Sequence, residues 1–186
     1  MALLKHALPM LLRPKSEWSV ISAKTITPFE LYLGYVVPLN IISPVAATVG
    51  IVEFIVSSAS VPEQWVALYW RATFSSLIAS YLWHLIEIYL LAHVANCFAP
   101  LFSGERHFLQ ALKVLAFAMT PICLGQIFLA VPIFSLDKSM VILSLFYSGY
   151  LLWLGLSVLM KVQPLKAFLH ASIIAMAFWA TSEAPK

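Results

Sequence analysis

Long apolar stretches alternate with short polar segments along the whole chain. A bilayer-spanning helix needs about 20 mostly apolar residues, and five stretches of that kind follow one another. They predict membrane-spanning helices over about residues 31–57, 65–98, 108–131, 140–160 and 165–181. We therefore predict an all-α protein, a polytopic membrane helix bundle of five transmembrane helices, as a single domain over residues 27–186. Its short loops should make neighbouring helices antiparallel.

The start of the first predicted span carries a clear helix-initiation signal. Thr27 is suited to the N-cap and Pro28 to the first helical position, and Glu30 completes a capping box. In this arrangement the threonine and glutamate side chains satisfy backbone N–H groups that have no partner inside the helix. The sequence therefore predicts that the first span begins close to residue 28.

Three prolines lie inside predicted spans: Pro38 and Pro44 in the first, and Pro121 in the third. Proline lacks an N–H donor and clashes with the preceding turn, so each should kink or interrupt its helix. Asn40 lies between the first two prolines. We expect its side chain to satisfy a backbone group that the kink leaves without a partner.

We predict that residues 1–26 form a basic arm ahead of the first span. The arm contains four cations, and its one apolar run is broken by Pro9 and is too short for a signal sequence. Its leucines and Trp18 could lie in the lipid headgroup zone on the cytoplasmic side. A partly disordered tail is the alternative.

Composition narrows the class of protein further. Of the 186 residues, 62% are hydrophobic and only 10% are charged, and the mean hydropathy is +0.92. These values exclude a cytosolic enzyme, a secreted disulfide scaffold and a disordered regulator. The net charge of +3 is thinly spread, which argues against a nucleic-acid partner. Cys97 and Cys123 are isolated, so we expect no metal site and no cofactor.

The distribution of Lys and Arg predicts the direction of insertion. With a cytoplasmic N-terminus, eight of these residues fall on the cytoplasmic side, namely Lys5, Arg13, Lys15, Lys24, Arg106, Lys113, Lys161 and Lys166. The opposite side has three, namely Arg71, Lys138 and Lys186. The positive-inside rule therefore favours an N-in/C-out topology.

The second predicted span has a polar face. At 100° per residue, five side chains fall within an 80° sector of this helix, namely Thr73, Ser76, Ser80, His84 and Glu87. Such a face should turn toward protein or water rather than lipid. Because His84 and Glu87 are three residues apart, they can hydrogen-bond. The pair could carry a proton or bind a cation, or it could link helices structurally.

Two further features concern contacts between helices. Glu53, near the end of the first span, could pair with Arg71 at the start of the second, or both could be solvated separately. Ser144, Ser148 and Gly149 in the fourth span would let another helix approach closely. That helix could belong to the same chain or to a second copy.

Several segments, taken in order, resemble the YIP (Ypt-interacting protein) family, in its bacterial branch. They begin with Trp18-x-x-Ile21 and with Tyr35, Pro38, Leu39, Ile42, Pro44 and Gly50 at their present spacing, followed by Ala99–Gly104, Gln110–Val114, Ala118–Pro121, Tyr147–Gly155 and Leu159–Val162. The resemblance covers about residues 17–175. Many members have Phe-Gly-Gly where this chain has Phe102-Ser103-Gly104.

The resemblance implies a five-span bundle with a cytoplasmic N-terminus in the bacterial cytoplasmic (inner) membrane. Eukaryotic relatives bind Rab-type GTPases through an N-terminal region. The arm of this chain is short and basic and lacks the Asp-Leu-Tyr-Gly-Pro motif of that branch, which argues against GTPase binding. The family provides no catalytic residues to transfer.

The sequence favours a non-enzymatic membrane scaffold or adaptor. It contains no nucleophile elbow and no phosphate-binding glycine loop, so we do not expect an enzyme. The expected partners are membrane lipid and other membrane proteins or a second copy of the chain. The alternative is a small oligomeric transporter or channel subunit that uses the polar face of the second span as a pathway.

Overall fold

The computed structural model describes residues 3–57, 63–130 and 134–182, and its side chains except at 53–57, 63–69, 129, 134–138 and 182. Every regular element in these ranges is helical. Five helical segments are long and apolar enough to cross a membrane: Pro28–Val52, Trp70–Phe102, Phe108–Phe128, Ser139–Leu159 and Pro164–Thr181. The predicted all-helical fold with five spans is therefore confirmed.

The arm and the spans are built from the following elements. The arm contains the 3-10 turn η1 (Leu4–His6), α1 (Ala7–Leu12) and α2 (Pro14–Ala23). The first span comprises α3 (Pro28–Leu31), the π-helical turn η2 (Tyr32–Val36), α4 (Val37–Asn40) and α5 (Ile42–Ser57). The second comprises α6 (Glu63–Phe98) and η3 (Ala99–Phe102), and the third α7 (Phe108–Ala118), α8 (Thr120–Gly125) and η4 (Gln126–Ala130). The last two are α9 (Phe134–Leu159) and α10 (Pro164–Ser182).

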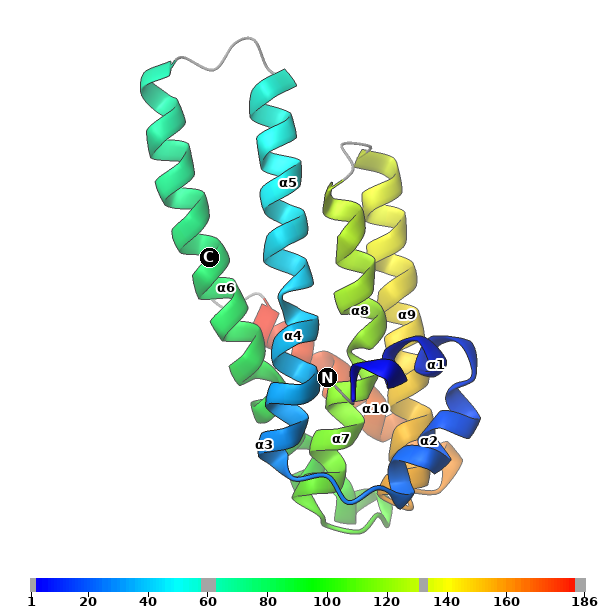
Figure 1. The fold of residues 1–186 in the computed structure, drawn as a ribbon. Helices are drawn as coiled ribbons and strands as arrows, with labels where there is room; N and C mark the ends of the chain where they lie inside the picture. Colours follow the sequence, from blue (N-terminus) through cyan, green and yellow to red (C-terminus); the bar gives the residue numbers. More distant parts are fainter. Residues whose placement is uncertain (1–2, 58–62, 131–133, 183–186) are drawn as a thin grey trace.

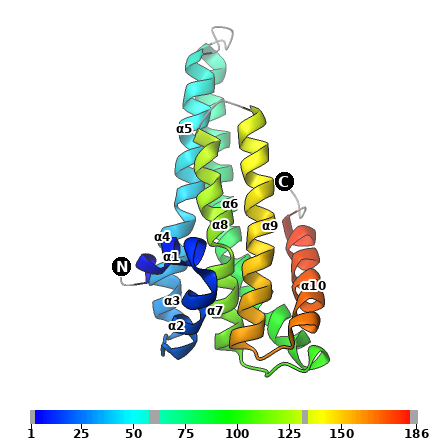
Figure 2. The same ribbon diagram turned by 90° about the vertical axis from the view of Figure 1, so that its right-hand side faces the viewer.

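The third span is the centre of the bundle. In its most apolar window 67% of the residues are buried, against 22 to 33% in the other four spans. Helix α7 packs against α6 on one side and α9 on the other, and α10 packs against both α6 and α9. The long helices α5 and α6 run side by side and extend past α8 at one end (Figures 1 and 2).

The capping box at the start of the first span is present as predicted. The backbone N–H of Thr27 donates to Glu30 Oε2 at 2.9 Å, and the Glu30 N–H donates to Thr27 Oγ1 at 3.2 Å. These two bonds satisfy groups that would otherwise lack partners at the membrane boundary. They fix where the chain turns from the arm into the first span.

The three prolines lie at irregular points of their spans. A π-helical turn over 32–36 precedes Pro38, and the first span is interrupted at Ile41, before α5 with its Pro44 begins. Asn40 Nδ2 donates to the Val36 carbonyl at 2.8 Å, so this side chain satisfies a backbone acceptor within the irregular stretch. In the third span, Pro121 lies in the first turn of α8, directly after the break at Met119.

The arm packs on the bundle through three buried apolar side chains. Trp18, Ile21 and Met10 are all completely buried. The Trp18 ring meets the edge of Phe117 with ring centroids 6.3 Å apart, and Gly155 of α9 lies directly against it. The prediction that Trp18 is an anchor at the membrane interface is therefore wrong. Helix α2 packs on α9, and this contact buries the indole within the protein.

Polar contacts also hold the arm in place. His6 Nδ1 pairs with the buried carboxylate of Glu17, and the Lys24 ammonium donates to His6 Nε2 at 2.5 Å. Lys113 of α7 is 2% exposed and donates to the Lys24 carbonyl at 2.7 Å. Because Lys113 belongs to the central helix, this bond ties the end of the arm to the middle of the bundle.

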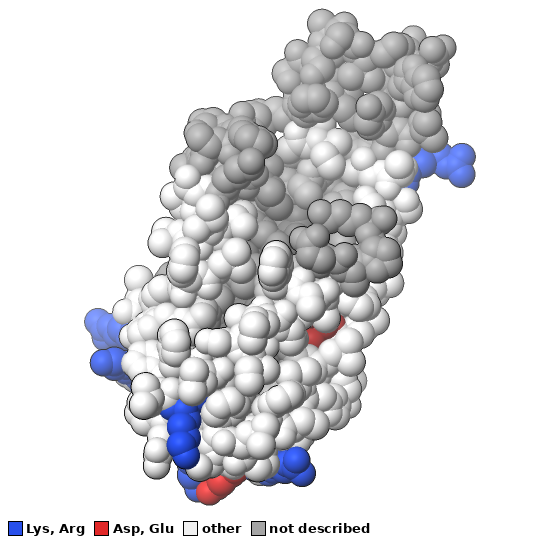
Figure 3. All heavy atoms as spheres, turned by 180° about the vertical axis from the view of Figure 1, so that it is seen from behind, with Lys and Arg blue, Asp and Glu red and all other residues white. Residues whose placement is uncertain are grey.

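The arm lies at the same end of the bundle as the turn after η3 and the turn between α9 and α10 (Figure 1). These two turns pair through Lys161 and Glu105 at 2.8 Å and through the Glu105 N–H and the Met160 carbonyl at 2.9 Å. Lys and Arg side chains gather at this end (Figure 3). Ser103 has a φ of 62°, a conformation that glycine adopts without strain.

We predict that Gly155→Ala loosens the arm. A Cβ at this position would lie 2.8 Å from Trp18 Cζ2 and 3.1 Å from Val114 Cγ1, so a buried ring would have to shift. We expect a loss of about 1–3 kcal/mol in the free energy of unfolding, measured by thermal unfolding in mild detergent, with faster proteolysis of the arm. In the control Gly149→Ala, on the same helix, the new Cβ meets no atom within 4 Å. Equal unfolding temperatures for the two variants would contradict the packing of Trp18 on α9.

Candidate functional site

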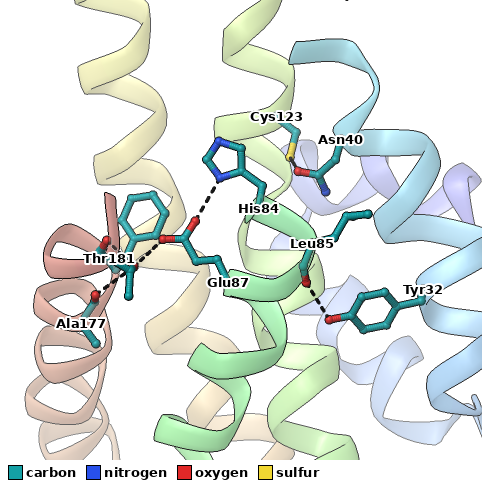
Figure 4. Close-up of polar contacts among 9 residues, drawn as sticks. Tyr32, Asn40, His84, Leu85, Glu87, Cys123, Ala177 and Thr181 are labelled. Carbon is teal, nitrogen blue, oxygen red and sulfur yellow. Dashed lines mark hydrogen bonds and ion pairs between the residues drawn. The ribbon is translucent and has the colours of Figure 1, made fainter. Parts of the chain in front are cut away.

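The candidate site is centred on Glu87, a carboxylate of α6 that is only 1% exposed. Its Oε2 lies 3.0 Å from His84 Nδ1, one turn earlier on the same helix. Its Oε1 accepts a hydrogen bond of 2.5 Å from the Thr181 hydroxyl of α10. Both oxygens of this buried carboxylate are therefore occupied, and one of the two bonds crosses between spans (Figure 4).

A small cavity of about 60 Å³ adjoins this group. Its walls come from the first, second, third and fifth spans, and its polar lining consists of Asn40, His84, Glu87, Cys123 and Gln126. A cavity needs about 10–15 Å³ to hold one water molecule, so there is room for only a few. The lining groups are the kind that hydrate or exchange protons with a buried carboxylate, and the volume is small for a drug-sized or nutrient-sized solute.

The remaining polar residues of α6 do not join the site. Ser76 and Ser80 are exposed, and Thr73 is half-buried. The Ser76 hydroxyl donates to the Thr73 carbonyl at 2.9 Å and the Ser80 hydroxyl to the Leu77 carbonyl at 3.1 Å. Within this chain the polar face meets protein at His84 and Glu87 but not at Ser76 and Ser80. For those two serines, the orientation of the face toward protein or water rather than lipid stays a prediction. At this level α6 meets α5 through its apolar side chains Leu77, Ile78 and Tyr81, and serine can satisfy its hydroxyl on its own helix.

The predicted pair of Glu53 and Arg71 cannot be placed, because the Glu53 side chain lies outside the described residues. Arg71 is exposed on α6. Of the small residues predicted to allow close approach in the fourth span, Ser144 makes a close contact within the chain, whereas a Cβ at Gly149 would meet nothing within 4 Å. A Cβ on Gly125 of α8 would lie 2.0 Å from Ser144 Oγ, so here α8 and α9 approach as closely as small residues allow.

Three contacts of this region are not evident from the sequence. Thr181 lies near the end of the last span, and only the packing of α10 on α6 brings its hydroxyl to Glu87. The Cys123 thiol donates to Asn40 Oδ1 at 3.7 Å and joins α8 to α4. Tyr32 donates to the Leu85 carbonyl at 3.1 Å. The sequence indicated only that polar side chains within spans tend to hydrogen-bond to neighbouring helices, not which residues would be the partners.

The chemistry open to this arrangement is limited. Among residues 3–57, 63–130 and 134–182, no three His, Cys, Asp or Glu side chains lie close enough to hold a metal ion. The His84–Glu87–Thr181 group can share or store a proton, and it can join α6 to α10. Because both carboxylate oxygens already have partners, the geometry favours the joining role.

We predict that Glu87 and Thr181 are energetically coupled. Glu87→Ala removes the acceptor on α6, which leaves the Thr181 hydroxyl only the carbonyls of Ala177 and Phe178 on its own helix. Thr181→Val removes the bond from the other side. We expect each to lower the free energy of unfolding by about 1–3 kcal/mol, and a double-mutant cycle to give a coupling of about 1 kcal/mol. The control Ser80→Ala removes a hydroxyl that bonds only its own helix, and it should change stability by less than about 0.5 kcal/mol. Strictly additive effects of the first two variants would contradict the bond between α6 and α10.

The comparisons with known proteins identify the family. The Yip1 domain family matches residues 9–181, which is nearly the whole chain and includes the arm from its first α-helix onward. No curated protein and no solved structure shows significant similarity to the chain. Together with the five candidate spans, this match shows that the chain is an integral, multi-pass membrane protein that belongs to the Yip1 family.

Proposed function

We propose that this Yip1-family protein is a non-enzymatic scaffold or adaptor that binds another membrane protein, or a second copy of itself, through helix packing. The observation that carries the proposal is the outer face of α6. Ala72, Ser75, Ser76, Ala79 and Ser80 are all exposed on this helix. Small side chains let two helices approach closely within a membrane, where packing rather than hydrophobicity drives association.

The polar site supports the same proposal rather than a transport pathway. Glu87 is occupied by partners on two helices, and the cavity beside it is about 60 Å³. The hydroxyls that would continue a pathway along α6, those of Ser76 and Ser80, are on the exposed face and are bonded to their own backbone. A transporter usually places its polar groups together at the interior of broken helices.

The proposed location is the bacterial cytoplasmic membrane, with the N-terminus inside and the C-terminus outside. The support is the clustering of Lys and Arg at the end of the bundle that carries the arm (Figure 3). Membrane lipid and a protein partner are the proposed ligands, and a GTPase is not among them. Trp18, Met10 and Ile21 of the arm are used in the core and are therefore not open to a GTPase.

We predict that bulky substitutions on the exposed face of α6 abolish association. The double variant Ser76→Leu with Ser80→Leu remains compatible with a lipid-facing helix but prevents close approach of a partner helix. We expect the amount of partner protein or second copy recovered after purification in mild detergent to fall about tenfold, the equivalent of about 1.4 kcal/mol. The matched control is Ala175→Leu, a similar enlargement at an exposed position of α10, which should leave recovery unchanged.

Two outcomes would contradict the scaffold proposal. One is equal recovery of the partner by the double variant and the wild type. The other is a proton-dependent ion flux in liposomes that the wild type carries and that Glu87→Gln abolishes while the unfolding temperature stays the same. The second outcome would instead support the transporter or channel alternative.

A further inference from the structure

We propose that the groove between the arm and the first span binds a phospholipid with a primary ammonium headgroup, of the phosphatidylethanolamine class. The open groove has a volume of about 520 Å³, within the range of about 300–1,000 Å³ typical of small-ligand sites. Its walls come from two parts of the chain, the arm and the start of the first span, namely Leu3, Lys24, Thr25, Ile26, Phe29, Glu30, Leu33 and Gly34.

The groove is polar at the end that lies just before the first span and apolar at the end inside the span, as is the phospholipid that would fill it. The first candidate span begins at Pro28. Lys24 and Thr25 come just before that boundary, whereas Leu33 and Gly34 lie inside the span. Phe29 and Leu33 are 72% and 54% exposed, so apolar surface is open on the membrane side. A lipid headgroup would lie against Lys24 and Thr25, and an acyl chain would lie along Leu33 and Gly34.

The two charged residues of the groove match a zwitterionic headgroup. The Lys24 ammonium has three N–H donors, and among the described residues its partner is His6. Glu30 receives both bonds from Thr27 on Oε2, which leaves Oε1 of this exposed side chain to accept another donor. A phosphate opposite Lys24 and a primary ammonium opposite Glu30 would form two charge-assisted hydrogen bonds.

The same pair disfavours the other common headgroups. An anionic phosphatidylglycerol would face the Glu30 carboxylate with no positive group of its own to neutralise it. A choline headgroup is cationic but has no N–H to donate to Oε1. The geometry therefore favours ethanolamine over both, although all three lipids carry the phosphate that Lys24 would bind.

The groove is held open by parts of the structure that are already fixed. Lys113 of the central helix donates to the Lys24 carbonyl, and His6 contacts its ammonium. On the other wall, Gly34 has no side chain, and a Cβ there would lie 3.5 Å from Leu3 Cδ1. This distance is ordinary van der Waals contact, so alanine fits at position 34 and a larger side chain would occupy the groove.

The test uses the full chain in nanodiscs that contain equal amounts of phosphatidylethanolamine, phosphatidylcholine and phosphatidylglycerol with the same acyl chains. Lipids that stay bound after extraction into mild detergent are counted by native mass spectrometry. We expect the wild type to retain phosphatidylethanolamine about fivefold more than either other lipid. That factor corresponds to one partly exposed, charge-assisted hydrogen bond.

Two variants test the two charged groups of the headgroup separately, Glu30→Gln its ammonium and Lys24→Gln its phosphate. Glu30→Gln keeps the capping box, because glutamine also serves at this position, so the fold should be retained. It should abolish the preference for phosphatidylethanolamine over phosphatidylcholine. Lys24→Gln should reduce the retention of all three lipids. The control Lys161→Gln, an exposed cation at the same end that pairs with Glu105, should change none of them.

A pair of substitutions at one position tests the apolar part of the groove. Gly34→Leu should reduce lipid retention by filling the groove, and Gly34→Ala should not. Equal retention of the three lipids by the wild type would overturn the proposal, as would a preference for phosphatidylglycerol. A ratio of phosphatidylethanolamine to phosphatidylcholine that Glu30→Gln leaves unchanged would also overturn it. Lipid binding here is independent of association through α6, so the two proposals can fail separately.

Discussion

The packing of aromatic rings around Phe117, in the central helix α7, is the interaction on which the rest of the structure depends. Trp18 of the arm meets the edge of this ring, and Tyr35 of the first span lies 4.3 Å from it between ring centroids. The Tyr35 hydroxyl is also 2.6 Å from Thr120 Oγ1, across the proline break between α7 and α8. Because Gly155 of α9 closes over Trp18, one cluster joins the arm to the first, third and fourth spans. Lipid provides no hydrophobic drive for helices to associate, so such close packing has to do so.

Polar groups within the spans follow two rules that have different consequences. Serine and threonine hydroxyls mostly bond the carbonyls of their own helix, as Ser76 and Ser80 do, and they place no demand on a neighbouring helix. Groups that cannot do this reach across. Glu87 is linked to Thr181 of α10, and the Tyr32 and Tyr81 hydroxyls join α6 to the first span. Few of the described residues therefore form hydrogen bonds between spans. A substitution at one of those residues weakens the contact between two helices and leaves each helix itself intact.

The sequence was sufficient for the spans, for the capping box at Thr27 and Glu30, and for the contact between His84 and Glu87, because each depends on residues that are close along the chain. It was insufficient where a contact depends on tertiary packing. Nothing near Trp18 distinguishes an indole at the membrane interface from one buried under Gly155. The 100° periodicity placed Ser76 and Ser80 on the same face as Glu87, but the packing of the chain covers Glu87 and leaves those serines exposed. Thr181 became a partner of Glu87 only through the packing of α10.

The two ends of the bundle differ physically, and this difference bears on how a scaffold could work. At one end, the Glu105–Lys161 pair joins two turns to each other, and the Lys113–Lys24 bond joins the arm to the central helix. Toward the other end, α5 and α6 extend past α8 and leave small and apolar side chains exposed (Figure 1). A partner helix that packs there would meet few competing intramolecular contacts. The charged end would meanwhile hold the bundle at a fixed depth in the membrane, so the exposed face would be presented to a partner at a constant height.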